Sequence, residues 1–87
     1  MTMIYTVLLL SRAKKQLSKL PAKEQKRIVQ ALTSLETDPF RGKQLHGNYE
    51  GAWAIRVWPY RIIYTIQRKV VTVTVLRVGH RQGVYKK

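Results

Sequence analysis

The chain has 87 residues, and its 17 lysines and arginines against 4 aspartates and glutamates give a formal net charge of +13 at pH 7. This length predicts one small domain, residues 1–87, which folds alone while burying only about 60–65% of its unfolded surface. The absence of cysteine excludes disulfides and argues against thiolate-bound metals. Such an excess of cations attracts polyanions, with nucleic acid as the first candidate, an anionic membrane surface as the second and an acidic protein as the third.

The first apolar segment, Met3–Leu10, is predicted to be a strand. It contains several strand formers and is apolar almost throughout, so we expect both of its faces to be buried. The segment is too short to span a bilayer, and no basic stretch precedes it and no small-residue cleavage site follows it. The expectation is a soluble cytoplasmic protein without a membrane partner.

Two amphipathic helices are predicted next. Ser11 is a plausible N-cap for the first, Pro21 suits the first position of the second, and Asp38-Pro39 ends it. Each helix has one apolar stripe, formed by Ala13, Leu17 and Leu20 in the first and by Ile28, Val29, Leu32 and Leu35 in the second. A helical hairpin with one apolar seam and a basic exterior follows from this pattern.

Residues 40–51 have no clear period, and beyond them the period changes to two. Three strands are predicted at 53–57, 60–66 and 71–75, joined by connections short enough for an antiparallel meander. The element order is therefore strand, helix, helix, strand, strand, strand. The predicted fold class is α+β, with the hairpin packed on one face of a single sheet.

Two arginines mark the other face of this sheet. Arg56 alternates with the apolar residues of its strand, and Arg61 does so in the next. If the apolar sets face the helices, both arginines stand on the open face and flank one short connection, so they lie close together. The terminal segment 79–87 (GHRQGVYKK) leaves the neighbouring strand and is expected to fold over that face.

The remaining residues limit the chemistry of a site. The four acids, at positions 24, 36, 38 and 50, form no acid–base pair, and His46 and His80 match no metal-ligand spacing, so neither a metal nor a cofactor is expected. Arginine, lysine, tyrosine and histidine suit cleavage of RNA by its own 2′-hydroxyl, because the substrate then supplies the nucleophile. The structural alternatives are a solvated sheet face for the arginines, a packed aromatic for Tyr85 and a turn residue for His80.

The segments LHGNYEGAWAIRVWPYRIIYTI (45–66) and VLRVGHRQGVYKK (75–87) resemble the RelE toxins of bacterial and archaeal toxin–antitoxin systems. The family pattern is approximately Leu-x-Gly, then Gly-x-Trp-x-Ile-Arg-Val, Tyr-Arg-x-x-Tyr, Val-Gly-His-Arg and a closing Tyr. The matching residues are Leu45, Gly47, Gly51, Trp53, Ile55, Arg56, Val57, Tyr60, Arg61, Tyr64, Val78, Gly79, His80, Arg81 and Tyr85. The element order agrees as well, so the resemblance covers the whole chain.

The resemblance implies a ribosome-dependent mRNA endonuclease. Such a toxin cuts the codon in the ribosomal A site and leaves a 2′,3′-cyclic phosphate and a 5′-hydroxyl. Carried over by position, Arg61 and Arg81 would stabilise the transition state, Arg56 would orient the phosphate, and Tyr85 would be the base and stack on a nucleobase. Many members have a second basic residue where this chain has Ala54. The cations available to replace it, and to bind RNA, are Lys43, His80 and Lys86.

The resemblance also implies partners and leaves alternatives. The partners are an acidic RelB-like antitoxin, the ribosomal A site and its mRNA, and operator DNA bound through the antitoxin. The related ParE toxins share much of the pattern and inhibit DNA gyrase by binding alone. A third alternative is a general RNA- or DNA-binding module. The combination of Arg56, Arg81 and Tyr85 favours the nuclease, because an inhibitor would not need all three.

Overall fold

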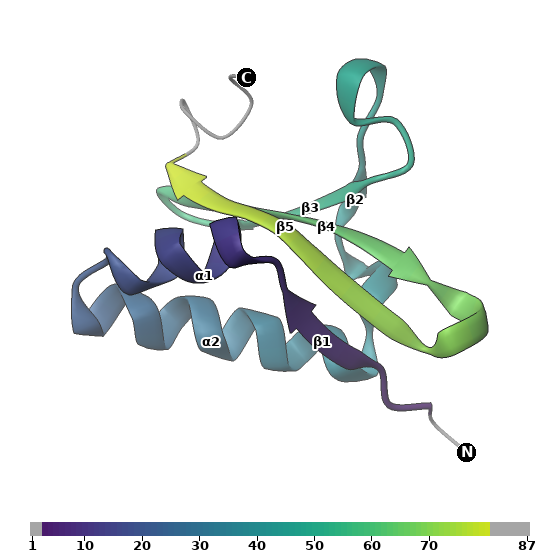
Figure 1. The fold of residues 1–87 in the computed structure, drawn as a ribbon, viewed down its shortest axis with the longest axis horizontal. Coiled ribbons are helices and arrows are strands. Elements are labelled where there is room, and N and C mark those ends of the chain that lie inside the picture. Colours follow the sequence, from purple (N-terminus) through teal and green to yellow (C-terminus); the bar gives the residue numbers. More distant parts are fainter. Residues whose placement is uncertain (1–2, 81–87) are drawn as a thin grey trace.

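The computed structural model describes residues 3–80 (Figure 1). Arg81, Tyr85 and Lys86, three of the expected site residues, lie outside this range. The helices and strands are β1 (Thr6–Leu9), α1 (Ser11–Ser18), α2 (Ala22–Thr37), β2 (Lys43–Gln44), β3 (Trp53–Val57), β4 (Tyr60–Gln67) and β5 (Thr72–His80). Three short 3₁₀ turns join them: η1 (Pro39–Arg41), η2 (Gly47–Tyr49) and η3 (Arg68–Val70). No helix in the described range is long and apolar enough to cross a membrane.

One five-stranded sheet forms the centre of the molecule, in the order β1-β5-β4-β3-β2. Strands β3, β4 and β5 form the predicted antiparallel meander, and β1 pairs with β5 in parallel. Both helices lie on one face of the sheet (Figure 1), so the predicted α+β architecture is confirmed. The short strand β2, which pairs with β3, was not predicted, because residues 40–51 show no alternation.

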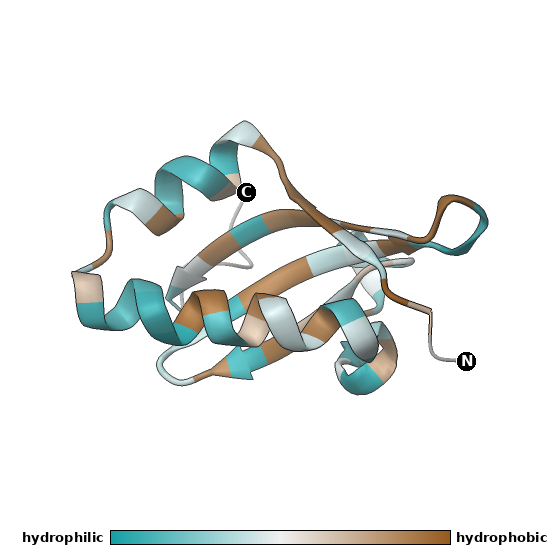
Figure 2. Ribbon diagram, turned by 90° about the horizontal axis from the view of Figure 1, so that it is seen from below, coloured by the Kyte–Doolittle hydropathy of each residue, from teal (hydrophilic) through white to brown (hydrophobic). Residues whose placement is uncertain are grey.

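The main core lies between the helices and this face of the sheet, and hydrophobic residues recur along both helices and the strands behind them (Figure 2). Its buried members are Tyr5, Ala13, Ile28, Leu32, Leu35, Ile55, Ile62, Tyr64, Val73, Val75 and Val78. Val29 was predicted to belong to the stripe of α2, but this is wrong, since 48% of it is exposed. It follows Ile28 directly, and one step along a helix turns a side chain by about 100° away from the seam.

Strand β1 and the helix starts also differ from expectation. Val7 and Leu9 pack against the core, whereas 54% of Leu8 is exposed, so burial on both faces was wrong. An edge strand covered by helices on one side alternates, whatever its composition. The N-cap position of α1 is occupied by Leu10 and not by Ser11, and that of α2 by Pro21, and neither has a side-chain capping bond.

The sheet face opposite the helices, here called the open face, carries a second apolar cluster. Ala52, Ala54 and Ile63 are buried there, and the partly buried residues that pack on them are Leu45, Tyr49 and Leu76. Residues 45–52 therefore cover part of a face that alternation alone predicted to be exposed. A bulge in β5 opposite Ile63/Tyr64 admits Leu76 to this cluster.

The end of β5 nearest the expected site is held from two sides. Strand β1 pairs only with Thr72–Val75, so it does not reach that end. Beyond it, the Gln16 side chain of α1 accepts a hydrogen bond from the backbone N–H of Val78 at 2.8 Å. A side chain of helix α1 thus pairs with the backbone of β5 beyond the point where strand β1 ends.

Tyr64 joins the sheet to the segment that follows α2. Its side chain is fully buried, and its hydroxyl donates a hydrogen bond to the Pro39 carbonyl at 2.7 Å. Burial raises the pKa of the Tyr64 hydroxyl to about 12. Gly42 passes so close that a Cβ there would lie 2.7 Å from the Ala54 carbonyl oxygen. Only glycine therefore fits this approach of the chain to β3.

Replacing Tyr64 by Phe tests the contribution of the hydrogen bond between the Tyr64 hydroxyl and the Pro39 carbonyl. At pH 7 the change should lower the free energy of unfolding by about 1–3 kcal/mol, because the buried Pro39 carbonyl loses its donor. The stability that is linked to this raised pKa is complete below the ordinary tyrosine pKa of ~10. It is lost as the pH rises to about 12. The parent chain should therefore lose about 3 kcal/mol relative to the variant over that interval.

Urea unfolding of both chains between pH 7 and 12 measures this difference. The lysines titrate in both chains, so their contribution cancels. A stability difference that stays constant across the interval would contradict the assigned role.

Candidate nucleic-acid interface

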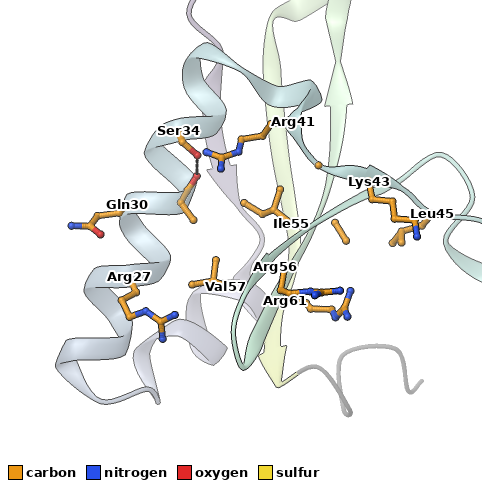
Figure 3. A pocket seen from close by; sticks show the side chains of 13 residues that line it. Arg27, Gln30, Ser34, Arg41, Lys43, Leu45, Ile55, Arg56, Val57 and Arg61 are labelled. Atoms are coloured by element: carbon orange, nitrogen blue, oxygen red, sulfur yellow. Dashed lines mark hydrogen bonds between the residues drawn. The ribbon is translucent and has the colours of Figure 1, made fainter.

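Arg56 and Arg61 face each other across strands β3 and β4, and we call them the arginine pair. Only the Trp58–Pro59 connection separates the two strands, so the register opposes the two residues directly. Both side chains project from the open face, whereas Ile55 and Val57 point back toward α2 (Figure 3). Arg56 is exposed and Arg61 is half-buried. The convergence expected from alternation is therefore present.

Lys43 belongs to the next row of the same face. It pairs with Ala54, which in turn pairs with Ile63, and directly paired residues share a face of the sheet. Its exposed ammonium lies on the same side of β3 as the arginine pair (Figure 3). Lys43 therefore extends the cationic surface toward β2.

Arg77 also lies on the open face, and sequence analysis missed it. It pairs with Ile63, and its Nη1 donates a hydrogen bond to the Tyr49 hydroxyl at 2.9 Å. Arg61 pairs with Gly79, so Arg61 and Arg77 are diagonal neighbours, within reach of long side chains. The predicted strand ended at 75, before the bulge, and assigned Arg77 no face. Continuing the VTVLRVG alternation with one bulged residue at Leu76 would have placed it.

His80 is placed differently from the other cations. It pairs with Tyr60, and the two rings meet edge to face with centroids 6.3 Å apart. Tyr60 packs against the helix-side core, so His80 stands on the face opposite the arginine pair. The structure therefore brings Arg56, Arg61 and Lys43 together and leaves His80 apart. The described part of β5 ends beside the arginine pair, since Gly79 lies opposite Arg61.

A groove of about 680 Å³ lies between α2 and the edge of β3. Strand β2 pairs only with Trp53 and Ala54, so among residues 3–80 the edge of β3 beyond Ala54 has no strand neighbour. The groove is lined by Arg27, Gln30, Ala31, Ser34, Arg41, Gly42, Lys43, Leu45, Ala54, Ile55, Arg56, Val57 and Arg61. Arg27 forms an ion pair with Glu24 at 2.8 Å. The residues that line the groove are cationic or neutral, and the groove leads onto the open face (Figure 3).

The open face is suited to binding and stabilising anionic oxygens. A guanidinium offers a planar fork of donors that matches a phosphate and never loses its charge near neutral pH. Two such groups held directly opposite one another repel, and an anion between them relieves that repulsion. Within the described range no group of three His, Asp or Glu side chains is arranged to hold a metal ion.

Comparison with known proteins relates this arrangement to a family. A model of the family described as ParE toxin of type II toxin-antitoxin system, parDE, matches residues 7–85. The chain is 36% identical over 87 residues to toxin RelG of Mycobacterium tuberculosis, and the match covers 98% of this chain and 100% of that protein.

Solved structures agree with the sequence matches. The toxin–antitoxin complex RelBE2 from M. tuberculosis matches with a TM-score of 0.84 and 36% identity, covering 91% of this chain and 93% of that one. The intact RelBE toxin–antitoxin complex of Escherichia coli matches with a TM-score of 0.75 and 25% identity, covering 87% and 95%. Because the family model and a relative at 36% identity both span nearly the whole chain, this protein belongs to the RelE/ParE superfamily of toxins from type II toxin–antitoxin systems.

Proposed function

We propose that this toxin is a ribosome-dependent endoribonuclease that cuts mRNA in the ribosomal A site and thereby stops translation. The observation that carries the proposal is the arginine pair, opposed on an exposed face with Lys43 in the next row. The likeness to RelG and to the toxins of RelBE complexes supports it. A net charge of +13 further favours a polyanionic substrate. The proposed place of action is the cytoplasm, where ribosomes translate mRNA.

In the proposed reaction the 2′-oxygen of the substrate attacks the adjacent phosphorus. A 2′-O–P bond forms and the P–O5′ bond breaks, which leaves a 2′,3′-cyclic phosphate and a 5′-hydroxyl. Tyr85, acting as its phenolate, accepts the 2′-hydroxyl proton and becomes a neutral phenol, and the departing 5′-oxygen takes up a proton from water. Arg61 and Arg81 stabilise the extra charge on the phosphorus oxygens, and Arg56 orients the phosphate. The guanidinium groups supply the positive charge, so the reaction is proposed to need no metal.

An antitoxin is the expected partner, because related toxins are found in RelBE complexes. We propose that this antitoxin is acidic and RelB-like and that one of its extended segments occupies the groove beside β3. The edge of β3 beyond Ala54, which has no strand neighbour within residues 3–80, offers backbone hydrogen bonds, and Arg27 and Arg41 offer charge. Because Lys43, Arg56 and Arg61 also line this groove, such a segment would cover cations that RNA otherwise contacts. The complex would then bind operator DNA through the antitoxin.

A binding-only inhibitor of DNA gyrase is the second candidate, and the match to the ParE toxin family favours it. The two functions differ in an assay that needs no variant. Added to a translation reaction, the nuclease cuts mRNA at A-site codons. Added to gyrase, the inhibitor blocks supercoiling and leaves mRNA intact.

Arg61→Gln should lower the single-turnover rate of mRNA cleavage on ribosomes about 10²–10³-fold, the usual loss for one donor to a developing charge. Its melting temperature should change little, because Arg61 lies on the open face and outside the helix-side core. Arg12→Gln, which removes an exposed cation from α1, is the matched control and should cleave normally. A variant of Arg61 that cleaves as fast as this control would refute the proposed role.

Arg56→Gln should raise stability while it weakens function. Removing one of two directly opposed like charges should increase the free energy of unfolding by up to about 0.5 kcal/mol at low salt. The gain should vanish in 1 M salt, where the screening length is about 3 Å. Arg12→Gln measures the gain expected from a lower net charge alone. An equal gain in both variants would show that the arginine pair carries no specific repulsion.

A further inference from the structure

Tyr49 and Arg77 connect the segment 45–52 to the site. The Tyr49 ring packs on the small apolar cluster of the open face, and its hydroxyl accepts the hydrogen bond from Arg77 Nη1 at 2.9 Å. Gly47 and Gly51, which bracket Tyr49, have φ values of 71° and 90°, in a region that other residues rarely adopt. This backbone brings the tyrosine back onto the sheet beside Arg77.

Arg77 is held more firmly than an ordinary surface cation. Its Nε is buried, as is that of Arg61, so the inner part of each guanidinium is shielded from solvent. Ile63, which is paired with Arg77 across the strands, is fully buried within the same cluster. The Tyr49 hydroxyl is a neutral acceptor, so this bond orients the guanidinium without cancelling its charge. A charge held in this way lowers the entropy lost when it binds an anion.

The position of Arg77 relative to Arg61 indicates what it binds. The two residues are diagonal neighbours on adjacent antiparallel strands, and the Cα atoms at such positions lie about 7–8 Å apart, so long side chains there reach neighbouring points of one ligand. This separation is comparable to that between successive phosphates of an extended RNA strand. One phosphate at the arginine pair therefore leaves the next phosphate in reach of Arg77.

We propose that Arg77, oriented by Tyr49, binds the phosphate next to the one that is cleaved and so sets the path of the single strand across β5. The proposal rests on the endoribonuclease function proposed above. Arg77 is then a substrate-positioning residue. Its loss should weaken RNA binding and leave the chemical step at saturation nearly unchanged.

Three variants test this. Arg77→Gln removes the positive charge, and Arg77→Lys keeps the charge but loses the planar set of guanidinium donors. Tyr49→Phe keeps the aromatic ring but loses the hydroxyl that accepts the hydrogen bond from Arg77. Lys69→Gln removes an exposed cation in η3, at the far end of β4 and β5, and is the matched control. Each chain is assayed for single-turnover cleavage over a range of ribosome concentrations. Each is also assayed for the salt dependence of binding to a short single-stranded RNA.

Arg77→Gln should raise the half-saturating concentration about tenfold, with a maximal rate within about threefold of the parent, because one phosphate contact is lost. Its log–log slope of affinity against salt should become shallower by about 0.7. Arg77→Lys should recover that slope without full affinity. Tyr49→Phe should weaken binding less than Arg77→Gln and keep the parent slope, since the charge remains.

A parent-like slope and half-saturation in Arg77→Gln would overturn the proposal, even with a lower melting temperature, because Arg77 would then only hold the loop. A large fall in maximal rate with unchanged half-saturation would also overturn it, by placing Arg77 in the chemical step. Failure of the parent chain to cleave would refute the endoribonuclease function instead. The slope of single-stranded RNA binding would still decide whether Arg77 contacts phosphate.

Discussion

The register of β3 against β4 is the constraint on which the proposed site depends. The two-residue connection between the strands places Arg56 directly opposite Arg61. In the same register Ile55 pairs with Ile62, and both side chains lie in the helix-side core. A slip by one residue would exchange the two sets, so the apolar core and the cationic face specify each other. The buried side chains thus hold two like charges directly opposite each other, an arrangement that is destabilising by itself.

Contacts on both faces of the sheet support this pairing of Arg56 with Arg61. On the helix side, the Tyr64 hydroxyl and the close passage of Gly42 bind the segment after α2 to the sheet beside β3. On the open side, residues 45–52 cover Ala54 and Ile63 and leave the cations next to them accessible. Where β1 ends, Gln16 holds the edge of β5. Few elements thereby fix the positions of the cations on the open face.

Alternation and helical spacing sufficed to predict the meander, the hairpin and the convergence of Arg56 with Arg61. They failed where neighbours decide the environment. The exposure of Leu8 depends on the edge position of β1, and the burial of Ile63 depends on a loop without a period. The bulge at Leu76 hid the face of Arg77. The roles of Arg81, Tyr85 and Lys86 stay predictions, because these residues lie outside the described part of the chain.

The proposed function requires that the open face, and not the groove beside α2, receives the RNA phosphates. The most direct measurement is NMR of the arginine Nε–H groups during titration with a short 2′-O-methyl RNA, which has no free nucleophile and stays uncut. We expect saturable shifts of the Nε–H signals of Arg56, Arg61 and Arg77. The signals of Arg12 and Arg68, which lie elsewhere on the fold, should stay unchanged. Shifts centred on Arg27 and Arg41, or no saturable shift on the open face at low salt, would contradict it.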